Sequence, residues 1–275
     1  MRHVKLLAGA AVVIAMAWPA FAQEDAAPRG PWEKWSISGG MFIADLDNTI
    51  RLGASGVGIE VDLEEALGLK SGQTVVRFDG AYRFGIEERH RVDFTWFDLS
   101  RDATRTLQAD ITLPDGTVLP IGTTVASEFN LAFYNVRYGY SFLKDDRIDF
   151  AGSLGLHITD VGLFLTDTSG VLGAGGDGVT APLPVIGGRL DVALTPKWYV
   201  RSSLEAFYLE FDSFTGSLVD ILVSAEYRAW ENFALGIGVN SVHLTVENDN
   251  SLGLEFDGRV KSDFSGLMFY GKAMF

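Results

Sequence analysis

Two pairs of residues have the types and spacing that chemistry could use. Ser241 and His243 stand two positions apart, so a strand places both side chains on one face, where a histidine can activate a serine hydroxyl as a nucleophile. Asp45 and Asp47 have the spacing that opens an EF-hand calcium loop, although the glycine and the closing glutamate of that loop are missing. The chain has no cysteine, which excludes thiolate nucleophiles and thiolate metal ligands.

The surroundings of both pairs argue against catalysis. Four apolar residues share the strand face of Ser241 and His243 and direct that face toward lipid: Phe233, Leu235, Ile237 and Val239. Other carboxylates join the Asp45–Asp47 pair near the ends of the first and last hairpins: Glu60, Glu247 and Asp249. This rim could bind divalent cations that bridge to lipopolysaccharide, but we favour a solvated acidic rim. We therefore predict no catalytic residue, no cofactor and no metal.

The N-terminus predicts export. Arg2 and Lys5 precede an apolar stretch from Leu6 to Trp18, and Ala20-Phe21-Ala22 is an A-x-A cleavage site. The apolar stretch is shorter than the roughly 20 residues that span a bilayer, so we predict a signal peptide at 1–22 and a mature chain from Gln23. Removing the signal peptide changes the formal charge from −14 to about −16, which disfavours nucleic-acid binding.

From residue 34 onward the pattern is a series of strands. Four of the nine connections are short and charged, at 87–90, 144–147, 195–197 and 231–232. The others lie at 54–73, 114–116, 168–180, 213–217 and 248–251. The ten predicted strands are 34–53, 74–86, 90–112, 117–143, 147–166, 181–195, 198–212, 217–230, 233–247 and 252–275. Residues 23–33 remain as a linker with two prolines.

Apolar residues alternate with polar and charged ones along these strands, as the period of a strand requires. At the C-terminus one face carries Leu267, Phe269 and Phe275, whereas Lys272 lies on the other face. Tryptophans stand where strands meet the short connections: Trp35, Trp198 and Trp230. This placement is typical of an aromatic girdle at a membrane interface.

Together these features resemble the small transmembrane β-barrels of Gram-negative outer membranes, the class of OmpA-like, OmpW-like and omptin-sized barrels. The resemblance implies an all-β, antiparallel up-and-down barrel at 34–275, with about ten strands and both termini in the periplasm. It implies that the last strand, with Leu267, Phe269 and Phe275, is the signal read by the barrel-assembly machinery. The other expected partners are outer-membrane lipid and lipopolysaccharide, and we expect a monomer.

By parity, a set of charged side chains faces the barrel interior. An unpaired charge in so narrow a lumen would be costly, and the set is close to balance, with eight basic and seven acidic residues. We predict an ion-paired plug that fixes the strand register; a narrow solute channel is the alternative, since larger barrels hold water. The residues are Arg77, Asp79, Arg83, Arg91, Asp93, Arg137, Asp149, Arg189, Asp191, Arg201, Glu205, Asp220, Glu226, Arg228 and Lys272, and His157 shares their face.

The segment "VDLEEALGLK" at 61–70 predicts a short helix within the first long loop. Asp62 and Glu65 form a capping box, and Gly68 provides the stop. The helix could be a lid over the barrel mouth, but we favour a packed loop that shields the barrel.

The segment "GAGGDG" at 173–178 matches the dinucleotide-binding pattern G-x-G-x-x-G. That pattern needs a helix directly after it, on which the pyrophosphate sits. Thr180, Pro182 and Pro184 follow instead, so we predict a flexible outer loop.

An enzyme at the outer rim is the third alternative. Omptin proteases have ten strands, and their site resembles two aspartates with an Asp-His pair. Asp45, Asp47 and His243 match it in part, but Ser241 stands where the pair needs its acid. The predicted function is therefore a structural or surface-interaction role in the outer membrane, without catalysis.

Overall fold

The computed structural model describes residues 31–52, 60–112, 118–169, 174–211, 214–248 and 258–275. The predicted signal peptide, most of the predicted linker and Asp249 lie outside these residues. Among the described residues, no helix is both long and apolar enough to cross a bilayer.

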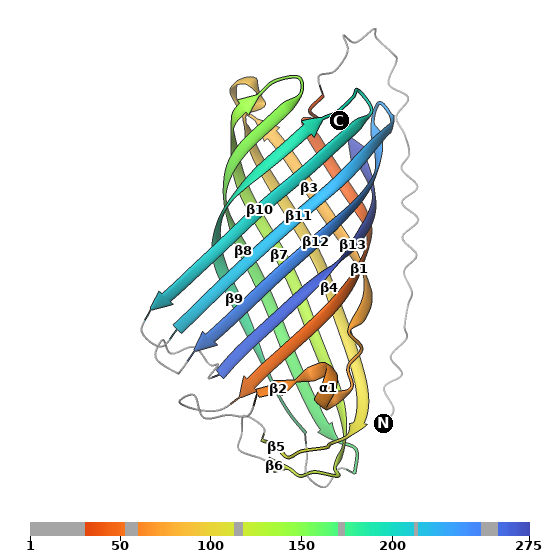
Figure 1. Cartoon of the computed structure of the whole chain (residues 1–275), viewed down its shortest axis with the longest axis vertical. Coiled ribbons are helices and arrows are strands. Elements are labelled where there is room, and N and C mark those ends of the chain that lie inside the picture. Colours follow the sequence, from red (N-terminus) through yellow and green to blue (C-terminus); the bar gives the residue numbers. More distant parts are fainter. Residues whose placement is uncertain (1–30, 53–59, 113–117, 170–173, 212–213, 249–257) are drawn as a thin grey trace, which may run out of the picture. The chain divides into compact units, whose positions relative to one another are not determined.

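Ten long antiparallel strands close into a barrel (Figure 1). The last strand pairs with the first from Ser36↔Met274 to Leu52↔Gly258, which removes the free sheet edges that a hydrocarbon environment does not tolerate. The barrel strands are β1 (Trp35–Leu52), β3 (Gly72–Phe84), β4 (His90–Thr106), β7 (Thr124–Lys144), β8 (Ile148–Asp167), β9 (Ala174–Ala193), β10 (Trp198–Phe211), β11 (Phe214–Trp230), β12 (Phe233–Asn248) and β13 (Gly258–Met274).

The prediction of a ten-stranded antiparallel barrel is confirmed. The four short charged connections all lie at one end of the barrel, here called the turn end. The strand ends that the other connections join lie at the opposite end, here called the loop end (Figure 1). The third predicted strand was too long, because β4 ends at Thr106. In the connection that follows, β5 (Ile111–Thr112) and β6 (Val118–Leu119) form a small separate sheet. The strand β2 (Glu60–Asp62) adds to the main sheet beside β1.

The prediction of a loop over the glycine-rich segment was wrong, since β9 begins at Ala174 and pairs with β8 from that residue on. Pairing of β9 with β10 starts only at Ile186↔Ala206. Pro182 and Pro184 lie in the part of β9 that has one neighbour, which suits them because proline has no amide hydrogen for a second ladder. The barrel wall is thus unpaired between β9 and β10 toward the loop end.

The interior changes from polar to apolar along the barrel. On β1 the inward residues change from Ser36 at the turn end to Phe42 and Leu46 farther along, and all three are buried. The apolar half is a packed core to which ten of the described helices and strands contribute. It includes the two leucines of α1 and five phenylalanines: Leu63, Leu67, Phe42, Phe97, Phe129, Phe133 and Phe264. The predicted charged interior therefore occupies only the turn-end half of the barrel.

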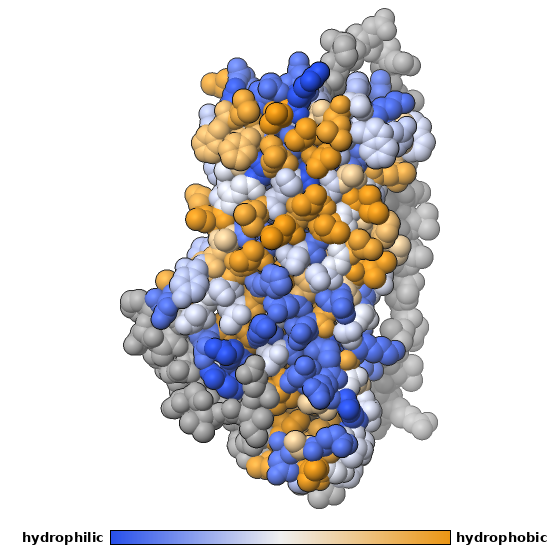
Figure 2. Space-filling model, in the orientation of Figure 1, coloured by the Kyte–Doolittle hydropathy of each residue, from blue (hydrophilic) through white to orange (hydrophobic). Residues whose placement is uncertain are grey.

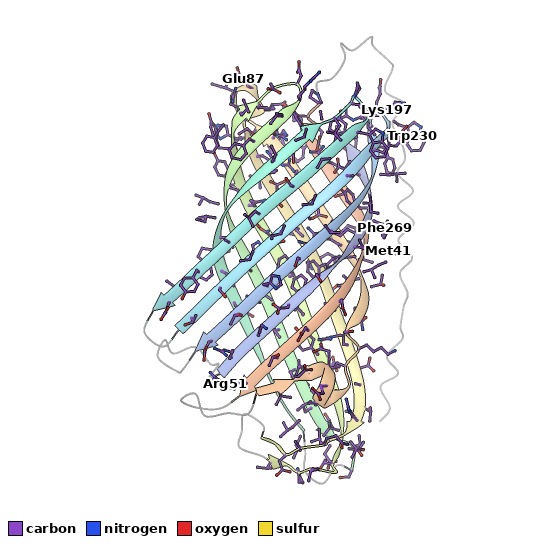
Figure 3. All side chains as sticks on the ribbon, viewed as in Figure 1. Met41, Arg51, Glu87, Lys197, Trp230 and Phe269 are labelled. Carbon is purple, nitrogen blue, oxygen red and sulfur yellow. The ribbon has the colours of Figure 1, made fainter. Side chains whose placement is uncertain are left out.

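The exterior changes in the opposite sense. On β1 the outward residues change from Ile37 and Ile43 to Asp45 and Asp47. Figure 2 shows an apolar belt next to the turn end and a mostly hydrophilic surface beyond it. Met41 and Phe269 lie within the belt, and Trp230 lies at the turn end (Figure 3). The loop-end half has the polarity of a water-facing antiparallel sheet, polar outside and apolar inside.

The short helix is confirmed as α1 (Leu63–Leu67), with Asp62 accepting from the Glu65 amide and Gly68 in the left-handed conformation at φ 72°. Leu63 and Leu67 are buried in the apolar core. Glu64 accepts from the Asn48 amide at 3.0 Å, so α1 is fastened to β1. These contacts agree with a loop that packs against the barrel.

Candidate functional site

Asp191 is the hub of the charged cluster nearest the turn end. Its Oδ2 lies 3.2 Å from Arg201, 3.4 Å from both Arg91 and Arg189, and 3.7 Å from Arg83. These side chains come from β3, β4, β9 and β10, so their contacts cross the lumen from one wall to the other. Four arginines around one carboxylate would repel one another, and further acids must therefore offset their charge.

Asp149 and Glu33 supply part of that negative charge. Asp149 pairs with Arg83 at 2.5 Å and with Arg189 at 3.1 Å. Glu33 lies in the segment predicted to be a linker, yet it is buried and pairs with Arg201 at 2.9 Å and Lys272 at 2.6 Å. The N-terminal segment thus adds a carboxylate to the interior. Parity could not predict it, because Glu33 precedes the first strand.

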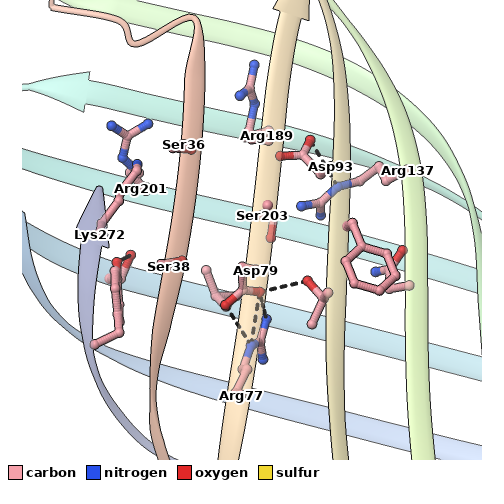
Figure 4. Close-up of a pocket in the computed structure, with 18 of the residues that line it drawn as sticks. Ser36, Ser38, Arg77, Asp79, Asp93, Arg137, Arg189, Arg201, Ser203 and Lys272 are labelled. Carbon is pink, nitrogen blue, oxygen red and sulfur yellow. Dashed lines mark hydrogen bonds and ion pairs between the residues drawn. The ribbon is translucent and has the colours of Figure 1, made fainter. Parts of the chain in front are cut away.

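A second set of ion pairs lies around a cavity of about 100 Å³ inside the barrel (Figure 4). Arg77 pairs with Asp79 at 2.9 Å, and Thr95 donates to the same carboxylate at 2.7 Å. Arg137 lies 3.6 Å from Asp93 and 3.2 Å from Glu205. Other pairs are formed by residues that line the same cavity: Arg91–Asp93, Arg201–Glu226 and Lys272–Glu226.

Two of the fifteen residues predicted to form the plug make no ion pair with a described residue. Arg228 donates to the carbonyl of Pro31 at 2.9 Å and lies 4.7 Å above the Tyr199 ring. Asp220 lines the cavity and accepts from Asn240 at 2.6 Å. The other thirteen all take part in ion pairs with described residues.

Four side chains from four strands meet beside the cavity. Asn135, His157 and Glu205 are buried, and Asn135 contacts both of the others, with His157 2.6 Å and Glu205 2.7 Å from its Nδ2. His157 Nε2 lies 2.6 Å from Glu205 Oε2. Polar atoms of His157, Glu205 and Asp220 all lie within 4.8 Å of one another. Among the described residues, these nitrogen and oxygen donors lie close enough together to be a candidate metal site.

Ser241 and His243 lie on the outer face of the barrel, at the edge of the apolar belt. Ser241 Oγ lies 3.4 Å from Nε2 of His243, and Asp263 on β13 lies 3.0 Å from its Nδ1. Sequence analysis missed Asp263, which reaches His243 through the β12–β13 register. Ser241, His243 and Asp263 are linked in the order of a Ser-His-Asp triad. Their backbone amides, however, belong to strands that are hydrogen-bonded to their neighbours in the sheet. No oxyanion hole of backbone N–H groups is therefore available from the strands that carry the three residues.

The rim carboxylates whose side chains the structure describes lie on β1 and β12. Asp45 and Asp47 lie on the outer wall of β1, where Asp47 is opposite Asp263. Glu247 is engaged by Arg51 and, at 2.8 Å, by Arg259. Asp45, Asp47 and His243 all project outward, and Asp263 on β13 lies between Asp47 and His243 in the sheet.

Comparison with known proteins places the fold. No family model matches the sequence, and no curated protein matches it. The outer-membrane protease OmpT from Escherichia coli is similar in structure, with a TM-score of 0.58 and 9% identity over 88% of this chain and 96% of that one. The fold is that of a small outer-membrane β-barrel.

Other barrels of this kind are similar at lower scores. The Pseudomonas putida toluene transporter TodX has a TM-score of 0.34 and 11% identity, over 90% of both chains. Ail, the attachment invasion locus protein of Yersinia pestis, has a TM-score of 0.33 and 12% identity, over 87% of this chain and 99% of that one. At these identities the likeness concerns the fold alone.

Proposed function

We propose that the protein is an integral outer-membrane barrel whose lumen is closed and whose loop-end half presents a structural or interaction surface outside the membrane. The observation that carries this proposal is the filling of the interior at two levels. Ion pairs such as Arg83–Asp149 and Arg137–Glu205 cross the turn-end half. The apolar core around Phe97 and Phe133 fills the loop-end half.

The orientation follows from the belt and the connections. Outer-membrane barrels have short periplasmic turns and longer outer loops, so the turn end, with Trp35 and Trp230, lies at the periplasmic interface. The apolar belt spans the membrane from there, and β1 leaves it near Asp45. Both termini are then periplasmic, and export uses the predicted signal peptide.

Single-cysteine labelling tests this orientation directly, because the chain has no cysteine of its own. Asp47→Cys places a thiol on the outer wall of the loop-end half, and Asp146→Cys places one in the β7–β8 turn. A membrane-impermeant maleimide should label the first variant on intact cells and the second only after the outer membrane is opened. Labelling of Asp146→Cys alone on intact cells would reverse the orientation.

A narrow solute channel is the second candidate, and the cavity lined by Arg77, Asp79 and Arg137 favours it. The cavity lies on the turn-end side of the apolar core. For a channel to form, the side chains of that core would have to move aside. The closed barrel needs no such movement, which is why we prefer it.

A further inference from the structure

The residues Asn135, His157, Glu205 and Asp220 lie together beside the cavity, and Glu205 joins this group to the ion-paired plug through Arg137. They come from β7, β8, β10 and β11, and Asn135 lies directly opposite His157 in the sheet. Glu205 lies opposite Gly187 on β9, where a Cβ atom would stand 2.9 Å from Glu205 Cγ. The glycine thus leaves room for Glu205 to reach across β9 to His157.

Three atoms of this group make contacts that protons alone cannot satisfy. Asn135 Nδ2, His157 Nε2 and Glu205 Oε2 lie 2.6–2.7 Å from one another. An amide nitrogen only donates, an ionised carboxylate oxygen only accepts, and Nε2 does one or the other. If Nε2 donates to Glu205, it faces a second donor on Asn135. If it accepts from Asn135, it faces a second acceptor on Glu205.

Glu205 is held in its ionised form by a cation on its other oxygen. Arg137 lies 3.2 Å from Oε1 of this carboxylate, so Oε2 remains an acceptor aimed at His157 and Asn135. The conflict among the three contacts therefore persists whichever imidazole nitrogen carries the proton.

A half-turn of the Asn135 amide removes the conflict if a cation is present. Asn135 is only 5% exposed, and its Oδ1 has no hydrogen-bond partner among the described residues. Turning the amide brings this oxygen to the position of Nδ2, beside His157 Nε2 and Glu205 Oε2. Three lone pairs then converge on one point, which is the requirement for binding a metal ion and is unfavourable without one.

Asp220 supplies a fourth ligand, the third oxygen of the set, from the cavity side. It makes no ion pair with any described residue, although it faces the lumen. Ligands about 2.1 Å from one ion lie at most about 4.2 Å apart, so a small rotation of Asp220 brings it from within 4.8 Å into range. Imidazole with carboxylate and amide oxygens suits Zn²⁺, Mn²⁺ or Fe²⁺ better than Ca²⁺ or Mg²⁺, which prefer oxygen ligands alone.

We propose that Asn135, His157, Glu205 and Asp220 bind one divalent transition-metal ion inside the barrel. The site holds four protein ligands on strands from one side of the wall, next to a cavity that can admit water. Its role is to link β7, β8, β10 and β11 across the place where β9 and β10 separate. This inference does not depend on the proposed closed lumen, since a conducting barrel could carry the same site.

The test uses the full mature chain, folded in detergent and stripped of metal with a chelator. Zn²⁺ and Mn²⁺ are titrated by calorimetry, and bound Mn²⁺ is observed by electron paramagnetic resonance. We expect one ion per chain, and a rise in the temperature at which the folded gel band is lost. Glu205→Gln and Asp220→Asn keep the side-chain shape and should each weaken binding at least about 10-fold, since even outer partners of a metal site have effects of that size.

Asp79→Asn is the matched control, because Asp79 lines the same cavity but lies outside the group of four. Its metal affinity should equal that of the unaltered protein. Two results would overturn the proposal: no stoichiometric binding of either ion to the unaltered chain, or affinity unchanged in both Glu205→Gln and Asp220→Asn. Metal titration of the unaltered chain needs no variant, so it still tests the proposal if a variant fails to fold.

Discussion

The backbone amide of Trp35 donates a hydrogen bond to the carbonyl of Phe275, and the Phe275 amide donates back to Trp35, each at 3.0 Å. This pair is the outermost rung of the β1–β13 seam that closes the barrel. The same residue, Phe275, is 58% exposed on the outer surface, where an aromatic ring fits the headgroup region of a membrane. Phe275 therefore pairs with the first strand to close the barrel and also places an aromatic ring on the outer surface.

Deletion of Phe275 should separate its two proposed roles. Loss of the ring and its rung should cost about 2–3 kcal/mol of stability after refolding in detergent. If the assembly machinery also reads this residue, the level of folded protein in the outer membrane should fall much further. Heat-modifiable gel migration measures both quantities, and normal membrane levels of the deletion variant would reject the assembly role.

The apolar core of the loop-end half should be as sensitive to truncation as the core of a soluble protein. Phe97 is 1% exposed and stacks 4.8 Å from Phe133, so Phe97→Ala should lower the free energy of unfolding by about 3–5 kcal/mol. Phe164→Ala is the control, because Phe164 is 50% exposed on the outside of β8. Denaturant unfolding followed by tryptophan fluorescence compares the two variants. Equal losses would contradict a packed core at this level.

Asp191→Asn should be among the most damaging single changes in the turn-end half. It removes the one carboxylate that four arginines share and leaves their charges poorly compensated, a loss of about 3–5 kcal/mol for a buried pair. Asp98→Asn, on the exposed face of β4, should change stability little. The same unfolding assay measures both variants, and a neutral Asp191→Asn would show that the interior is hydrated enough to screen these charges.

The outer-face group of Ser241, His243 and Asp263 should not hydrolyse esters or peptides. Its backbone amides are engaged in the sheet, and Asp263 is shared with Lys261 at 3.3 Å. Purified protein should give the same background rate as His243→Ala with a lipid ester and with a peptide substrate. Hydrolysis that disappears in both His243→Ala and Ser241→Ala would establish an enzyme and overturn this prediction.

The period of the strands predicted which face each residue occupies, but not the depth at which that face changes environment. Phe42 and Ser36 share the inward parity of β1, yet one lies in an apolar core and the other in a polar layer. Strand register decides which residues on adjacent strands become neighbours, and the sequence pattern does not reveal that register. Neither the strand period nor a motif could therefore predict that Asp263 lies next to His243, or that Asn135 lies next to His157.

Planar-bilayer conductance of the refolded barrel tests the central claim of a closed lumen most directly. A closed barrel should give no stable open channel. Arg137→Ala should give none either, because the apolar core still blocks the path beyond the ion pairs. A steady conductance in the unaltered protein that changes with Arg137→Ala or Arg189→Ala would contradict it and establish a narrow channel lined by these arginines.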